Sequence, residues 1–214
     1  MNYKKLLVEA GLKMYNSHLT VETWGNISAC DREKNLVYIT PSGMNYCTVT
    51  EDDMVVVDMK GEYVEGIRKP SIEKPMHVAV YNARPDVNAV IHAHPIYSTA
   101  FSSMGEDIPL LHDEAAQTLG DTVRTADYAL PGTADIAAQC IKALGGKANA
   151  CLLRSHGSVC VGRNMDYCFK VAAVLEMSAR IYYLIRSMGG SYIPISEKNI
   201  AAMQEFIRAG GYGQ

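Results

Sequence analysis

The sequence of 214 residues predicts an α/β protein in which helices cover a mixed, largely antiparallel sheet. Helical and strand-like segments are interleaved along the chain, which favours a layered α/β architecture. Several strand-like segments are joined by short turns, which connect antiparallel neighbours and argue against a regular doubly wound parallel sheet. The length and a hydrophobic content of 48% fit one sizeable core, so we expect residues 1–214 to form a single domain.

The N-terminal half is expected to begin with a helix and to continue with strands. Residues 3–16 carry apolar side chains at helical spacing. The strands expected here are 24–29, 36–39, 54–59 and 87–94. The charged turn at 31–35 predicts that the first two form a hairpin. Pro75 suits the first position of a helix that runs to about residue 82.

The C-terminal half alternates in the same way. The expected helices are 134–144, 166–188 and 196–208, and the expected strands are 150–154 and 158–161. The first two helices each stop at a Gly-Gly pair, which is a common helix end. Ser196 is a suitable N-cap for the last helix. The two strands would pair around His156-Gly157.

Composition and charge exclude several classes of partner. The net charge is −3 and no basic block occurs, so neither nucleic acid nor an anionic membrane is an expected partner. The N-terminus lacks the apolar core of a signal peptide, and we expect a cytoplasmic protein. The six cysteines form no CxxC pair, and all six are expected to be reduced and buried.

A His-x-His pair ends the strand expected at 87–94. Side chains two apart on a strand share a face, so His92 and His94 would lie side by side. A catalytic zinc takes three protein ligands and keeps a position open, and His156 is the natural third ligand. The alternative is that these are ordinary histidines at a strand end and in a turn. His77 has no such context and is expected on a helix surface.

Three turns rich in small residues form a second feature. They lie at 25–28, 40–43 and 70–71, and they offer hydroxyls, an amide and backbone N–H groups. Such turns can bind a phosphate without much positive charge. No nucleotide-binding glycine motif is present, and the alternative is that these are simply turns.

These pieces occur in a particular order. They are TWGNIS (23–28), ITPSG (39–43), KPSIE (69–73), VIHAHP (90–95) and RSHG (154–157). In that order the chain resembles the class II aldolase/adducin family over nearly its whole length, and within it the L-fuculose-1-phosphate aldolases and L-ribulose-5-phosphate 4-epimerases. The resemblance implies a three-layer α/β/α sandwich and a homotetramer with active sites between subunits.

The resemblance also assigns roles to residues. It implies Zn²⁺ on His92, His94 and His156, with Glu73 as the acid/base carboxylate. The residues implied to bind the substrate phosphate are Gly25, Asn26, Ser42, Gly43 and Ser71. The implied activity is that of a class II aldolase, which cleaves a small phosphorylated ketose like L-fuculose 1-phosphate into dihydroxyacetone phosphate and an aldehyde. Such cleavage leaves an enediolate, whose charge a divalent metal can stabilise.

Other members of the family remain as alternatives. Thr40 and Glu73 are typical of the aldolases, whereas TWGNIS and the run at 52–66 favour an L-ribulose-5-phosphate 4-epimerase. A decarboxylase or dehydratase on the same zinc scaffold is a further possibility. A non-catalytic adducin-like module is disfavoured, because a binding module does not need the three histidines and the glutamate.

Two positions depart from the family pattern. Ile72 stands where the family places a second phosphate-binding serine, and this removes a hydroxyl donor. Asp113 stands where the fucose-type aldolases have a proton-donating tyrosine, so Asp113 or Glu114 is a candidate replacement or an ordinary loop carboxylate. Tyr212 matches the family's mobile C-terminal tyrosine and is expected to close over the site and pass a proton, with a disordered tail as the alternative.

Overall fold

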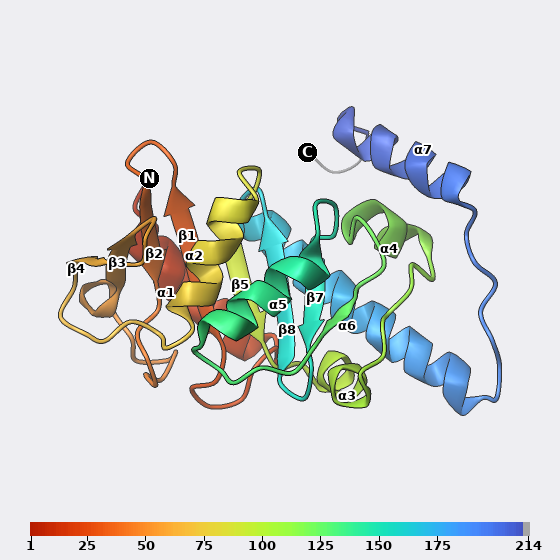
Figure 1. The fold of residues 1–214 in the computed structure, drawn as a ribbon, viewed down its shortest axis with the longest axis horizontal. Coiled ribbons are helices and arrows are strands. Elements are labelled where there is room, and N and C mark those ends of the chain that lie inside the picture. Colours follow the sequence, from red (N-terminus) through yellow and green to blue (C-terminus); the bar gives the residue numbers. More distant parts are fainter. Residues whose placement is uncertain (212–214) are drawn as a thin grey trace.

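The computed structural model describes residues 1–211 (Figure 1). The helices are α1 (Tyr3–Asn16), η1 (Glu51–Asp53), α2 (Lys74–Ala83), α3 (Ile96–Met104), α4 (Asp113–Thr118), α5 (Ala134–Leu144), α6 (Met165–Ser187) and α7 (Glu197–Arg208). The strands are β1 (Asn26–Asp31), β2 (Leu36–Ile39), β3 (Val55–Asp58), β4 (Tyr63–Glu65), β5 (Ala89–Ala93), β6 (Thr125–Ala126), β7 (Ala150–Leu153) and β8 (Gly157–Gly162).

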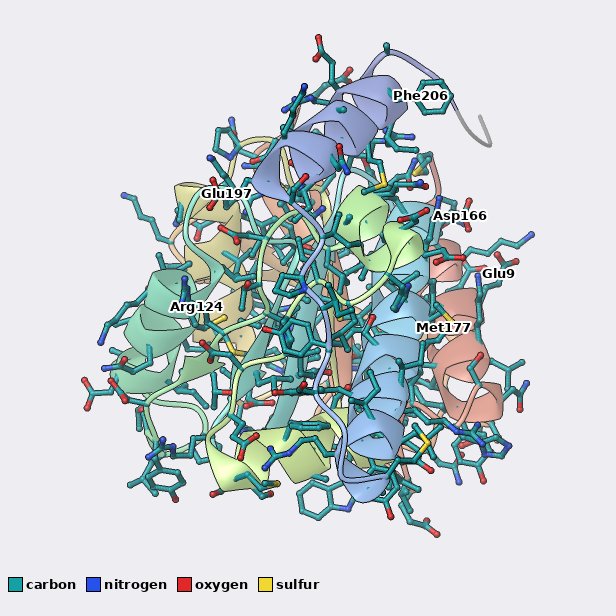
Figure 2. All side chains as sticks on the ribbon, turned by 90° about the vertical axis from the view of Figure 1, so that its right-hand side faces the viewer. Glu9, Arg124, Asp166, Met177, Glu197 and Phe206 are labelled. Atoms are coloured by element: carbon teal, nitrogen blue, oxygen red, sulfur yellow. The ribbon has the colours of Figure 1, made fainter. Side chains whose placement is uncertain are left out.

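All of these strands belong to one mixed sheet. Their order is β4-β3-β2-β1-β5-β8-β7-β6, and only the edge pair β6–β7 is parallel. Helices α2 and α5 cover one face of the sheet, while α1 and α6 cover the other, as the edge-on view in Figure 2 shows. The three-layer α/β/α sandwich with a largely antiparallel sheet is therefore confirmed.

The core follows the alternation of side chains along the central strands. In β5, Ile91 and Ala93 pack on the face covered by α1 and α6. Val90 packs on the opposite face, among the side chains of α2 and α5. This alternation puts His92 on the α2 face, where it is fully buried. The division of the β5 side chains between the two cores thus determines that His92 faces α2 and not α1 or α6.

The register of the central strands brings distant residues together. Asn26 of β1 lies directly opposite His92 of β5, and His92 lies opposite Val159 of β8. The turn between β7 and β8 carries His156 next to the same strand ends. Three segments far apart in the sequence therefore meet at one end of the sheet.

The structure supports most of the expected elements and adds several short ones. The helix expected at 134–144 has those bounds, and Ser196 caps α7 by accepting a hydrogen bond from the Asn199 N–H. Strand β1 begins two residues later than expected, because Gly25 has a φ of +76° and ends the preceding turn. The elements absent from the expectation are η1, β4, β6, α3 and α4. All five are short.

Helix α3 shows why sequence reasoning missed such segments. Its residues IYSTAFSSM include β-branched residues and serines, which have weak helix propensity. Its N-terminus is stabilised from outside, because the Glu176 carboxylate accepts hydrogen bonds from the N–H groups of Tyr97 and Ser98. The stabilising partner lies in α6, far along the chain, so no local pattern reveals it.

Two expectations about single residues were wrong. Cys47 is exposed, whereas the other five cysteines are buried as expected. His77 does not lie on a helix surface but is fully buried between α2 and β1, where hydrogen bonds satisfy both ring nitrogens. Within residues 1–211, no helix has both the length and the apolar character that a membrane span requires.

Candidate metal centre

The three histidines converge at the end of the central strands. The Nε2 atom of His92 lies 3.0 Å from Nε2 of His94 and 3.3 Å from Nε2 of His156. The ring centroids lie between 4.7 and 5.0 Å apart, and each pair of rings is steeply inclined. The three side chains therefore direct the same ring nitrogen at a common point.

This arrangement fits a metal ion. Nitrogen ligands at about 2.0–2.1 Å in a tetrahedral site lie about 3.3 Å apart, close to the separations seen here. The Nδ1–H of His92 donates to the carbonyl oxygen of Ser158, 2.9 Å away, and this leaves the lone pair of Nε2 free for a metal. Among the described residues, His92, His94 and His156 form the one such group of potential ligands.

The charge state of the imidazoles also suits metal binding. Burial, together with the charge on His92, lowers the pKa of His94 to about 3 and that of His156 to about 4. Burial would also lower the pKa of His92, but the Glu73 carboxylate outweighs it and raises that pKa. Two of the three rings are thus neutral near pH 7, which is the form that binds a metal.

Glu73 stands beside the cluster at the N-cap of α2. Its Oε2 accepts a hydrogen bond from the Asn26 amide at 2.8 Å and lies 3.1 Å from Nε2 of His92. Burial would raise the pKa of Glu73, but the charge on His92 and the hydrogen bonds from His92 and Asn26 lower it. Glu73 is 5% exposed, and its Oε1 lies 3.7 Å from Nε2 of His156 and has no hydrogen-bond partner among the described residues. A buried, ionised carboxylate with one oxygen free of hydrogen bonds is well placed to exchange a proton.

Glycine is required next to His156. A Cβ atom on Gly157 would lie 2.5 Å from Cδ2 of His94 and 2.6 Å from the carbonyl oxygen of Ala93. Both distances are far below van der Waals contact. The absence of a side chain at this position therefore lets the β7–β8 turn approach β5, and so lets His156 reach the other two histidines.

An open pocket of about 310 Å³ leads to the cluster. It is lined by Thr23, Trp24, Gly25, Asn26, Pro41, Ser42, Gly43, Ser71, Ile72, Glu73, His94, Pro131 and His156. All five residues expected at the phosphate lie in this lining. The lining residues include no lysine or arginine, so an anion would be held there by hydroxyl, amide and backbone N–H groups.

The structure does not bring every predicted residue to this pocket. Asp113 is exposed at the start of α4 and is not among the lining residues, and Glu114 is exposed beside it and pairs with His112. Asp113 therefore has no place in the pocket formed by its own chain. Tyr212 lies outside the described residues.

Sequence reasoning missed other residues of the site. The Trp24 ring lies 6.2 Å from the His94 ring, and Pro131 also lines the pocket. His77 and Tyr81 lie behind Glu73 on the same helix, four and eight residues further on. That spacing marks one face of a helix, so it is the signal that would have placed them next to Glu73.

Comparisons with known proteins agree with this geometry. Residues 5–183 match the family model described as Class II Aldolase and Adducin N-terminal domain. A 5-deoxy-D-ribulose 1-phosphate aldolase of Bacillus thuringiensis serovar kurstaki is 38% identical over 97% of this chain and 95% of its own length. An L-ribulose-5-phosphate 4-epimerase of Salmonella paratyphi B is 32% identical over 99% of this chain and 98% of its own length. The solved structure of an L-fuculose 1-phosphate aldolase superposes with a TM-score of 0.92 at 36% identity, covering 96% of both chains.

Proposed function

The chain belongs to the class II aldolase and adducin family, and on that premise we propose that it is a metal-dependent aldolase acting on a small phosphorylated ketose. It would release dihydroxyacetone phosphate and an aldehyde. The observation that carries this proposal is the convergence of three Nε2 atoms beside a buried carboxylate, at the base of a pocket lined by small polar turns.

The three histidines would hold the metal, with Zn²⁺ as the proposed ion because imidazole ligands favour it. When bound, the metal supplies a Lewis acid for the negative charge that develops on the substrate oxygens. Glu73 would carry the proton that leaves or joins the reacting carbon. Its burial in a pocket wall keeps bulk water from competing for that proton.

The turns at the pocket mouth would hold the phosphate. Gly43 has a φ of +67° and open space where its Cβ would be, so an anion can approach its backbone. Ser71 is buried, and its hydroxyl already accepts a hydrogen bond from the Glu73 N–H at 3.2 Å. Phosphate bound at this serine would therefore be linked through the Ser71 hydroxyl to the backbone of Glu73, which favours correct alignment of the reacting atoms.

The identity of the sugar is proposed from two relatives. The names of the Bacillus relative and of the solved structure describe ketose 1-phosphates that end in a methyl group. The pocket lining also includes the apolar side chains of Trp24 and Pro131, which would suit such an end better than a hydroxylated one. The proposed substrate class is therefore a deoxyketose 1-phosphate.

A substrate panel tests the proposal. The zinc-loaded protein is incubated separately with L-fuculose 1-phosphate, L-rhamnulose 1-phosphate, a 5-deoxypentulose 1-phosphate and L-ribulose 5-phosphate, and each mixture is followed by proton NMR. Dihydroxyacetone phosphate and an aldehyde from any of the first three would support the aldolase. No cleavage of any of them would refute it.

The epimerase is the second candidate, because the Salmonella epimerase matches this chain over nearly its full length. That activity would appear in the same experiment as conversion of L-ribulose 5-phosphate to xylulose 5-phosphate without cleavage of the 1-phosphates. Two residues favour the aldolase. Glu73 provides a glutamate at the acid/base position, and Thr40 precedes the Pro41-Ser42-Gly43 turn.

We further propose that the chain forms a homotetramer with pockets between subunits. Two large apolar residues that line the pocket are exposed, Trp24 at 64% and Ile72 at 65%. Ile96, two residues beyond His94, is 77% exposed. Burial of these side chains against a neighbouring subunit would stabilise an assembly. Sedimentation equilibrium at micromolar concentration measures the stoichiometry directly.

A further inference from the structure

A stripe of polar side chains runs along the buried face of α2 behind the metal centre. Glu73, His77 and Tyr81 follow one another at intervals of four residues, so they lie on one side of the helix. They face Asn26 and Ser28, which point to the same side of β1. All five residues are buried. Two regular elements therefore hold a line of polar groups inside the protein.

Hydrogen bonds join the five side chains end to end. The phenol oxygen of Tyr81 lies 2.7 Å from Oγ of Ser28, which lies 2.6 Å from Nδ1 of His77. The other ring nitrogen of His77, Nε2, lies 2.5 Å from Oδ1 of Asn26. The Asn26 amide nitrogen lies 2.8 Å from Oε2 of Glu73. The chain thus ends on the carboxylate assigned to proton transfer.

The direction of each bond follows from the carboxylate. An ionised carboxylate only accepts, so the Asn26 amide must donate to Glu73 and present its carbonyl oxygen to His77. That oxygen also only accepts, so His77 must carry its proton on Nε2. Burial lowers the pKa of His77 to about 3, so the ring is neutral and Nδ1 accepts from the Ser28 hydroxyl. Tyr81 then donates to Ser28, and every donor points toward Glu73.

We propose that His77 is a positioning residue, which holds the Asn26 amide in the one orientation that anchors Oε2 of Glu73 and leaves Oε1 for proton transfer. Without the Nε2–H of His77, the buried carbonyl oxygen of Asn26 loses its donor, and only Glu73 itself still distinguishes the amide nitrogen from the oxygen. A rotated amide would direct its carbonyl oxygen at the carboxylate, and the two oxygens would repel each other. The inference rests on the proposed role of Glu73.

Two amide substitutions separate this role from mere filling of a buried site. The amide nitrogen of glutamine and Nε2 of histidine are separated from Cβ by the same number of bonds. The glutamine in His77→Gln can therefore still donate to Asn26. In asparagine the amide occupies the place of Nδ1, so His77→Asn keeps the contact with Ser28 and loses the donor to Asn26. Ser178→Ala is a control for loss of a buried hydrogen bond, because Ser178 lies on α6 beyond the other face of the sheet.

The kinetic experiment compares these variants on the substrate that the panel identifies. His77→Asn should lose about 100-fold in kcat with KM unchanged, because a displaced catalytic group costs roughly that factor. His77→Gln should retain kcat within about 5-fold, and zinc affinity should stay constant in both, since neither contacts a ligand nitrogen in the structure. Wild-type kcat in His77→Asn, or equal losses in both variants, would overturn the proposal.

A second readout does not depend on catalysis. Long-range ¹H–¹⁵N spectra of the metal-free protein report the tautomer of each histidine. His77 should carry its proton on Nε2 from pH 6 to pH 8, and a proton on Nδ1 would overturn the proposed chain of donors. If wild type were inactive on every sugar phosphate, the proposed function would fail while the spectra still decided the orientation of Asn26.

Discussion

Glu73 and His92 meet at the end of the central strands, with Oε2 of the carboxylate 3.1 Å from Nε2 of the imidazole. In the metal-free protein a proton on Nε2 would bridge the two groups, which is why the pKa of His92 is raised against the effect of its burial. A metal on His92 would replace that proton. Metal binding would then release the Glu73 carboxylate from His92 and so prepare it to act as a base.

Gly157 should be indispensable for metal binding. In Gly157→Ala the new methyl group would overlap the His94 ring and the Ala93 carbonyl, so His156 and His94 would be forced apart. We expect zinc affinity to fall at least about 10-fold, since even supporting residues around a metal contribute this much. Competition titration with a chromophoric chelator measures it.

Gly146→Ala is the matched control for this change. Gly146 has open space where its Cβ would be, and it lies in the loop after α5, away from the pocket lining. Its substitution should leave zinc affinity unchanged. Equal affinities in the two alanine variants would show that the approach of the β7–β8 turn to β5 does not determine the site.

Ile72→Ser should improve phosphate binding. Ile72 lines the pocket mouth and is 65% exposed, so a serine there can turn its hydroxyl toward a bound phosphate without a loss of core packing. One added hydrogen bond to a charged group is worth about 1.5 kcal/mol, or roughly a 10-fold lower KM, with kcat unchanged. Ile72→Ala removes the same apolar bulk without adding a hydroxyl. If it lowers KM equally, the gain comes from space and not from hydrogen bonding.

Stability of the metal-free protein should fall on acidification, partly through His77. Its pKa is near 6.5 when the chain is unfolded and about 3 when folded, because the ring is buried. Between these values the unfolded state binds one more proton, so the free energy of unfolding decreases by about 1.4 kcal/mol for each unit that the pH falls below about 6. Above pH 6.5 this contribution is complete and constant.

Comparison with His77→Gln isolates that contribution. His94 and His156 also have lowered pKa values and change stability in the same direction, whereas the raised pKa of His92 acts in the opposite one. These effects are common to both proteins. Urea unfolding between pH 5 and pH 6 should therefore show a shallower pH dependence in His77→Gln, and parallel curves would contradict the assignment of a neutral buried His77.

The sequence was sufficient to predict the histidine cluster. The His-x-His spacing puts two imidazoles on one face of a strand, and Gly157 marks the turn that brings in His156. The layered architecture followed from strands joined by short turns and alternating with amphipathic helices. These signals are local, because each depends on interactions between residues that lie close together in the sequence.

The remainder of the site depends on long-range packing. The register that sets Asn26 opposite His92 is a property of two strands far apart in the chain. His77 was predicted on a surface because α2 was considered alone, without β1 against it. The spacing of Glu73, His77 and Tyr81 places them on one face of α2, but only the packing of the helix on the sheet makes that face an interior network.

Hydrogen exchange of dihydroxyacetone phosphate tests the central claim most directly, because it requires no knowledge of the aldehyde. In D₂O, the zinc-loaded protein should catalyse the exchange of one of the two hydrogens on the hydroxymethyl carbon of dihydroxyacetone phosphate for deuterium. Proton NMR follows the exchange. The rate should fall at least about 100-fold in Glu73→Gln, with zinc retained, and in His92→Ala, with zinc lost. Absence of exchange in wild type, or undiminished exchange in Glu73→Gln, would contradict the account of a metal centre served by the Glu73 carboxylate.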